Sequence, residues 1–150
     1  AKAIGLNFIL SVFFLVWSAD VFAYFGGRAL GKRKLAPAIS PGKSWAGVWS
    51  GMIGALLVAA AWLAIDAAGS LGTESFYSIA ANRFGFVGMA LIVVFLVAMS
   101  IVGDLFESLV KRSAGAKDSS KLLPGHGGVL DRIDALLPVF PLALALTSLT

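Results

Sequence analysis

The sequence predicts an all-α protein that crosses a membrane several times. Of its 150 residues, 59% are hydrophobic and only 13% are charged, and the mean hydropathy is +0.91. A soluble domain is typically about 45–50% apolar and about 25% charged. Because a bilayer core about 30 Å thick requires roughly 20 apolar residues per helix, the chain can supply about four spans. We expect one membrane-embedded domain over residues 1–150.

Four apolar runs define the expected helices in chain order. They extend from Ile4 to Phe25, from Trp45 to Ile65, from Phe86 to Val102 with a more polar continuation to Glu107, and from Ile133 to the C-terminus. The last run contains Pro138 and Pro141. Proline removes a helix hydrogen bond and clashes with the preceding turn, so we expect this helix to be kinked or broken near its start.

The distribution of charge predicts the orientation in the membrane. The net charge is +4, and the chain contains no cysteine, which excludes a disulfide scaffold and a cysteine-ligated metal site. Residues 26–44 contain five Lys or Arg and no acid, and residues 103–134 are also rich in Lys and Arg. Cytoplasmic loops carry such an excess, so we expect a multi-pass inner-membrane protein with both loops in the cytoplasm and no nucleic-acid partner.

Five carboxylates are predicted to collect at the cytoplasmic ends of three spans. They are Asp20, Asp104, Glu107, Asp131 and Asp134. The i, i+3 spacing within 104/107 and 131/134 places each pair on one helix face. Such a group of hard oxygen ligands favours Mg²⁺ or a similar cation. The alternative is that the acids form salt bridges, as the spacing of Glu107 and Lys111 allows.

The third loop combines basic residues with glycines around the single histidine. Gly125, Gly127 and Gly128 surround His126, downstream of Lys117 and Lys121. Glycine lets the backbone approach a phosphate, and consecutive amides can bind an anion. His126 could donate to a phosphate or transfer a proton. A plain turn with a structural histidine is the alternative, and no P-loop pattern is present.

Two blocks of the sequence resemble one enzyme family. The pattern Ser108-Leu-Val-Lys-Arg-x4-Lys117-Asp118-x-Ser120-x2-Leu123-Pro124-x-His126-Gly-Gly-Val-x-Asp131-Arg132-Ile133-Asp134 resembles the signature of the phosphatidate cytidylyltransferases, also called CDP-diacylglycerol synthases. The block from Ser18 to Trp45 resembles their other motif region. Two positions depart from the pattern, because Ala46 stands where Glu is expected and Ser50 where Gly is expected. Family members are longer, so the chain resembles their C-terminal catalytic part.

The resemblance implies the reaction of CTP with phosphatidate to give CDP-diacylglycerol and pyrophosphate. It implies a divalent cation such as Mg²⁺, with a monovalent cation as a further candidate, and CTP, phosphatidate and membrane lipids as partners. The implied catalytic residues are Asp104, Asp131, Lys111, Arg112 and His126. The implied metal ligands are Asp104, Asp131, Asp20, Glu107 and Asp134. The implied substrate-binding residues are Arg28, Lys32, Lys34, Ser40, Lys43, Ser44, Lys117, Asp118, Lys121, Gly127, Gly128 and Arg132.

Three alternatives remain open from the sequence. A CTP-dependent transferase could act on another lipid phosphate, such as an archaeal-type lipid, and share this architecture. A truncated relative could hold the motifs and be inactive. A channel, transporter or assembly subunit could carry interfacial charges without catalysis. Gly51 and Gly54 on the second span also permit close helix contacts, which makes a homodimer a candidate.

Overall fold

A computed structural model describes residues 5–69, 72–115 and 133–148 of the chain. In these ranges the elements are α1 (Leu6–Leu30), β1 (Lys34–Ala36), β2 (Ser40–Ser44), α2 (Trp45–Ala67), α3 (Phe76–Ser113) and α5 (Leu136–Ser148). The first three helices are long and apolar enough to cross a membrane, whereas α5 has 13 residues and is shorter than a full span. The prediction of a helical protein with several spans is confirmed, and the fourth helix is short.

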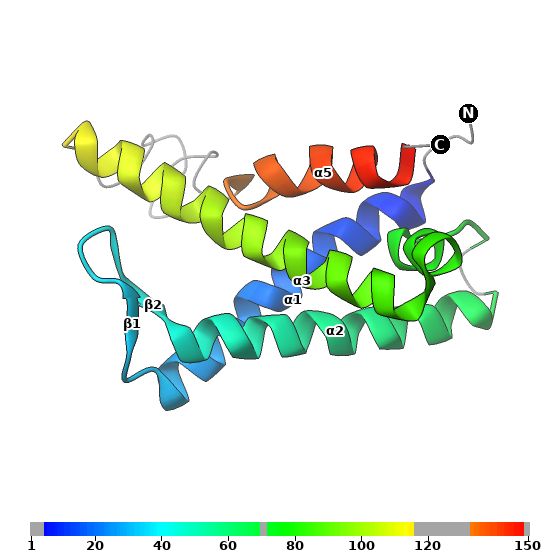
Figure 1. The fold of residues 1–150 in the computed structure, drawn as a ribbon, viewed down its shortest axis with the longest axis horizontal. Helices are drawn as coiled ribbons and strands as arrows, with labels where there is room; N and C mark the ends of the chain where they lie inside the picture. Colours follow the sequence, from blue (N-terminus) through cyan, green and yellow to red (C-terminus); the bar gives the residue numbers. More distant parts are fainter. Residues whose placement is uncertain (1–4, 70–71, 116–132, 149–150) are drawn as a thin grey trace.

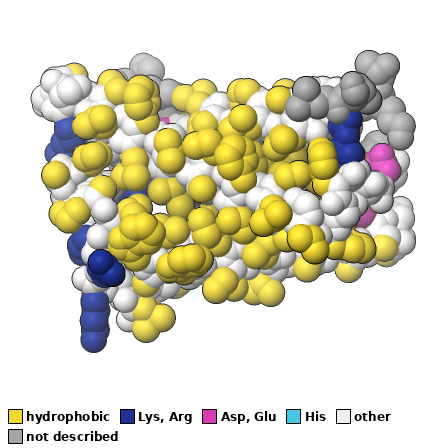
Figure 2. Space-filling model, in the orientation of Figure 1, with side chains coloured by type: hydrophobic (Ala, Val, Ile, Leu, Met, Phe, Trp, Pro, Cys, Tyr) yellow, Lys and Arg dark blue, Asp and Glu magenta, His cyan; other side chains and the backbone are white. Residues whose placement is uncertain are grey.

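The helices run back and forth along the long axis of the molecule (Figure 1). The β1–β2 hairpin and the end of α3 lie at one end, and the start of α5 is directed toward that end from nearer the middle. The start of α1, the end of α5 and the turn from α2 to α3 lie at the other end. Figure 2 shows hydrophobic side chains over the middle of one face and charged side chains toward its two ends. This is the surface expected of a protein whose middle faces lipid.

The packing of α1 against α2 depends on glycines within the chain. A Cβ added at Gly51 would lie 2.8 Å from the carbonyl oxygen of Ala19, and one at Gly54 would lie 2.2 Å from the ring of Phe22. The Ser50 hydroxyl donates to the carbonyl oxygen of Phe22 at 2.9 Å. Gly51 and Gly54, which suggested a contact between two copies of the chain, therefore pack against α1 of the same chain. Ser50, where the family pattern has Gly, adds a hydrogen bond to this α1–α2 contact.

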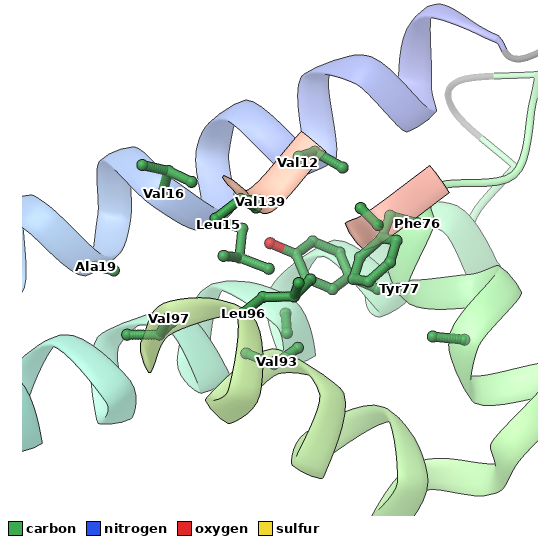
Figure 3. Close-up of a cluster of buried hydrophobic side chains, with 14 of the residues drawn as sticks. Val12, Leu15, Val16, Ala19, Phe76, Tyr77, Val93, Leu96, Val97 and Val139 are labelled. Carbon is green, nitrogen blue, oxygen red and sulfur yellow. The ribbon is translucent and has the colours of Figure 1, made fainter. Parts of the chain in front are cut away.

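Helix α3 is interrupted near its start. Gly85 has φ 72° and ψ 173°, which are not helical values and which side chains with a Cβ rarely adopt. The turns before this break were not predicted as part of a helix. They carry Phe76 and Tyr77, which are fully buried and meet Leu15 and Leu96 in the core (Figure 3). The break lets the chain pack these two rings before the long, lipid-facing part of α3 begins.

A polar network joins the three long helices at the end opposite the hairpin. The Asp66 carboxylate accepts hydrogen bonds from Asn7 Nδ2 at 2.9 Å, from the Ser75 backbone N–H at 3.2 Å and from the Ser78 hydroxyl at 2.5 Å. The Trp62 indole N–H donates to Asn7 Oδ1 at 2.9 Å. Asp66 thus has donors on both of its oxygens and holds the start of α3 against α1 and α2.

The segment between α1 and α2 forms a hairpin, where the sequence predicted only a loop. Strands β1 and β2 pair antiparallel, with Lys34 opposite Ser44. The Ser44 hydroxyl accepts from the Gly47 backbone N–H at 3.2 Å and caps α2, and the Trp45 N–H donates to the Arg33 carbonyl at 3.1 Å. The second strand is therefore fixed at the first turn of α2, which places Lys43 within reach of Asp104 on α3.

Candidate functional site

Three acids from three parts of the chain line one cavity. Asp20 on α1, Asp104 on α3 and Asp134 just before α5 border a space of about 330 Å³, together with the apolar side chains of Trp17 and Leu136. This confirms that the topology brings acids from the first, third and fourth runs to one place. An apolar wall beside carboxylates limits water on that side, which strengthens their attraction for cations.

Two of these acids form a tighter group with a fourth carboxylate. One carboxylate oxygen of each of Asp104, Glu107 and Asp134 lies within 4.8 Å of the others. Asp104 and Glu107 are one helical turn apart on α3, so their side chains share a face. We call Asp104, Glu107 and Asp134 the acidic cluster. Its ligand atoms are hard oxygens, the type that Mg²⁺ and Ca²⁺ prefer, so the residues present fit a divalent cation.

A glycine allows the acidic cluster to form. A Cβ added at Gly103 would lie 2.7 Å from Pro138 Cγ and 3.0 Å from the Asp134 carbonyl oxygen. The start of α5 therefore lies directly against the backbone of α3, one residue before Asp104. Sequence reasoning did not select Gly103. A glycine directly before an acid near the end of a span was the available signal.

Two lysines neutralise part of the negative charge. Lys111 Nζ lies 3.3 Å from Glu107 Oε2, one helical turn away, and Lys43 on the hairpin forms an ion pair with Asp104. The salt bridges considered from the sequence are thus present for two acids. Among the described residues, these two ion pairs involve two of the four carboxylates that gather here.

A second cavity, of about 460 Å³, is basic. It lies between the end of α1 and the hairpin and is bordered by Arg28, Lys32 and Lys34, together with several glycines and Tyr24. The Arg28 guanidinium donates to the Tyr24 hydroxyl at 3.3 Å. None of these three cations pairs with a carboxylate within the part of the chain that the structure describes. We call this space the basic pocket; it can accept an anion.

The remaining predicted site residues fall into two groups. Ser40 begins β2, Ser44 caps α2 and Arg112 is exposed near the end of α3, outside both cavities. The others lie outside the described residues, so the structure gives no position for them. They are Lys117, Asp118, Lys121, His126, Gly127, Gly128, Asp131 and Arg132.

Comparisons with known proteins point to one family. Residues 1–150 match the model of the cytidylyltransferase family. The chain is 51% identical over 137 residues to a phosphatidate cytidylyltransferase of Haemophilus influenzae, covering 91% of this chain and 44% of that protein. It is 50% identical to the Pseudomonas aeruginosa phosphatidate cytidylyltransferase, over 92% of this chain and 46% of the relative.

A more distant relative carries the same name. The phosphatidate cytidylyltransferase of Bacillus subtilis is 39% identical over 97% of this chain and 49% of its own length. The chain therefore spans about half the length of the curated relatives it matches. With a match over its whole length and relatives of this identity, the chain belongs to the cytidylyltransferase family.

Proposed function

We propose that this chain forms the catalytic part of an enzyme that transfers the cytidylyl group of CTP to phosphatidate. The family and the names of the relatives support this activity. The observation that carries the proposal is the meeting of four carboxylates with Lys43 and Lys111 at one end of the helices. Such an arrangement suits a reaction between two polyanions, in which opposing charge must be neutralised at several phosphates at once.

The reaction needs no strong base. A phosphate oxygen of phosphatidate, already ionised near pH 7, attacks the α-phosphorus of CTP. The bond from that phosphorus to the oxygen bridging the α- and β-phosphates breaks, and pyrophosphate leaves with the bonding electron pair. Lys43 and Lys111 lie where they could neutralise charge on the α-phosphate and on the departing pyrophosphate. The contribution of this chain is therefore to position and neutralise charged groups.

The acidic cluster is the proposed cation site. Asp104, Glu107 and Asp134 would hold a divalent cation, and Asp20 faces the same cavity from α1. When bound, such an ion supplies positive charge to phosphate oxygens of the nucleotide. The role we assign to these acids is to hold that charge beside Lys43 and Lys111, at the membrane end where a nucleotide arriving from water could reach it.

The basic pocket is the proposed position of the lipid phosphate. Arg28, Lys32 and Lys34 provide three positive charges there. Tyr24 and Phe25 on the same end of α1 are 60% and 63% exposed, which suits contact with acyl chains in the surrounding leaflet. Phosphatidate could thus approach sideways from the membrane while CTP approaches from water. In this arrangement the two substrates are attracted by separate groups of charges.

We also propose that this end of the molecule faces the cytoplasm of a bacterial inner membrane. The β1–β2 hairpin and the end of α3 lie at this end, and the sequence is rich in Lys and Arg over residues 26–44 and 103–134. Such loops are retained on the cytoplasmic side, which is also where CTP is made.

An activity assay with one substitution tests the proposed function. The whole protein would be incubated with CTP labelled at the α-phosphate, phosphatidate and Mg²⁺, and CDP-lipid separated by chromatography. We expect product from the unaltered protein and a loss of at least about 100-fold in Asp104→Asn, which removes one charge from the acidic cluster. Glu74→Gln, an equal change of charge on an exposed residue at the opposite end, should retain activity. Product formation by Asp104→Asn at the unaltered rate would contradict the assignment.

A further inference from the structure

Lys43 is the basic residue of the hairpin that pairs with the acidic cluster. Its ammonium pairs with Asp104, a member of the acidic cluster, across the gap between the hairpin and α3. The Lys43 side chain is 23% exposed and that of Asp104 is 33% exposed, so water and ions can reach both. A partly exposed ion pair of this kind is weak and exchangeable.

Hydrogen bonds hold the backbone beside Lys43, and an ion pair holds its side chain at Asp104. The neighbouring Ser44 caps α2, and the Trp45 N–H bonds to the Arg33 carbonyl, so the strand cannot move away without breaking these bonds. Lysine, in contrast, carries its charge on a flexible four-carbon stem. Any change of partner at Lys43 must therefore be a movement of the side chain.

The ammonium of Lys43 and a divalent cation would compete for the same oxygens. Asp104 supplies a carboxylate to both, and only a few ångströms separate the members of the acidic cluster. Two cations at such a distance repel each other. A phosphate held by the bound ion would at the same time offer Lys43 a new anionic partner nearby. Lys111 differs because it pairs with Glu107 along its own helix and stays within one turn of it.

We propose that Lys43 is an exchangeable counter-ion of the acidic cluster. Its ammonium neutralises Asp104 when no divalent cation is bound, and it moves to a phosphate of the nucleotide when the cation binds. This inference rests on the proposed function and extends it, because it makes one side chain couple cation binding to nucleotide binding. An empty site is thereby protected from charge repulsion, and the lysine becomes available only when the nucleotide can use it.

The coupling predicts opposite effects of one substitution. Lys43→Met in the whole protein, held in phosphatidylcholine nanodiscs, should bind Mn²⁺ about tenfold more tightly without nucleotide, because a competing charge is gone. With saturating Mn²⁺, it should bind CTP about tenfold more weakly, because a phosphate partner is gone. The Mn²⁺ affinity is measured by electron paramagnetic resonance and the CTP affinity by calorimetry.

Two further variants separate charge from structure. Lys43→Arg keeps the positive charge and should bind Mn²⁺ within about threefold of the unaltered protein. Arg33→Met removes a charge from an exposed residue of the same segment that borders neither cavity, and it should leave both affinities within about twofold. If Lys43 only held the hairpin in place, Lys43→Met would weaken the binding of both Mn²⁺ and CTP. That result would overturn the proposal.

A measurement on the unaltered protein avoids dependence on folding of the variants. Acylation of lysine amines, read by mass spectrometry, should increase at Lys43 when Mg²⁺ alone is added and decrease again when CTP follows. The reactivity of Lys43 in the same protein without added ligands is the reference. Unchanged reactivity of Lys43 in a protein that binds both ligands overturns this inference alone. A protein that binds neither ligand contradicts the proposed function instead.

Discussion

The contact of Gly103 with the start of α5 predicts that Gly103→Ala damages the cation site more than the fold. The new Cβ would lie 2.7 Å from Pro138 Cγ and 2.9 Å from its Cδ. Carbon atoms normally pack about 3.5–4.0 Å apart, so Pro138 must retreat by roughly 1 Å. Asp134 must move with it, because its carbonyl oxygen would be 3.0 Å from the same Cβ.

The cost to the fold is small because two effects oppose each other. Overpacking of this kind costs about 1–3 kcal/mol. Alanine is favoured over glycine within a helix by about 1 kcal/mol, which offsets part of that cost. A net loss of about 0–2 kcal/mol lowers the melting temperature by at most about 8 °C, because 1 kcal/mol corresponds to about 2–4 °C in a protein of this size. The site is more sensitive, since loss of a group that positions a metal ligand typically costs about 10- to 100-fold in affinity.

The assay compares Mn²⁺ affinity with thermal unfolding in the same nanodiscs. Gly103→Ala should bind Mn²⁺ about 10- to 100-fold more weakly while its melting temperature falls by no more than about 8 °C relative to the unaltered protein. Gly42→Ala is the matched control for both quantities, because no heavy atom lies within 4 Å of a Cβ added there. Unaltered Mn²⁺ affinity in Gly103→Ala would refute the reasoning, since it would mean that Asp134 need not lie where the α3–α5 contact places it.

Three further predictions concern stability and follow from single contacts. Arg83→Met should fray the end of α5, visible as faster hydrogen exchange over residues 143–148, because the guanidinium donates to the carbonyl oxygens of Leu146 and Thr147. Asp66→Asn should lower the melting temperature by an amount equivalent to about 1–3 kcal/mol, because an amide cannot accept from donors on both sides; an unchanged melting temperature would contradict this. Gly51→Val should destabilise the protein by at least about 1–3 kcal/mol through its clash with the carbonyl oxygen of Ala19, measured by thermal unfolding against Gly42→Ala.

The features predicted from the sequence are those that depend on local pattern and span topology. The second span was expected to begin at Trp45, and α2 begins there because Ser44 precedes it as a cap. The i, i+3 spacing placed Asp104 and Glu107 on one face, and they belong to one cluster. Alternation of spans across the membrane was enough to bring Asp20 and Asp134 to the same cavity.

The features that were missed depend on contacts between distant residues or on short segments. The hairpin at residues 34–44 contains Pro, Gly, Lys and Ser, which favour loops, and it is fixed by the cap of α2 rather than by strand propensity. The helical turns before Gly85 are too short and too polar to form a span. The pairing of Lys43 with Asp104 joins residues far apart in the sequence, so no spacing rule could identify it.

The position of the carboxylates and the charge around them determine cation binding at the acidic cluster separately. Gly103 sets the distance between Asp134 and the acids of α3, whereas Lys43 sets the charge that an incoming cation must displace. Loss of the first should weaken cation binding, and loss of the second should strengthen it. If the acids only formed structural salt bridges, substitution of Gly103 and substitution of Lys43 would change cation binding in the same direction. Either substitution would then loosen the group of acids. The opposite signs therefore distinguish a site organised to receive a cation from acids that only stabilise the end of a helical bundle.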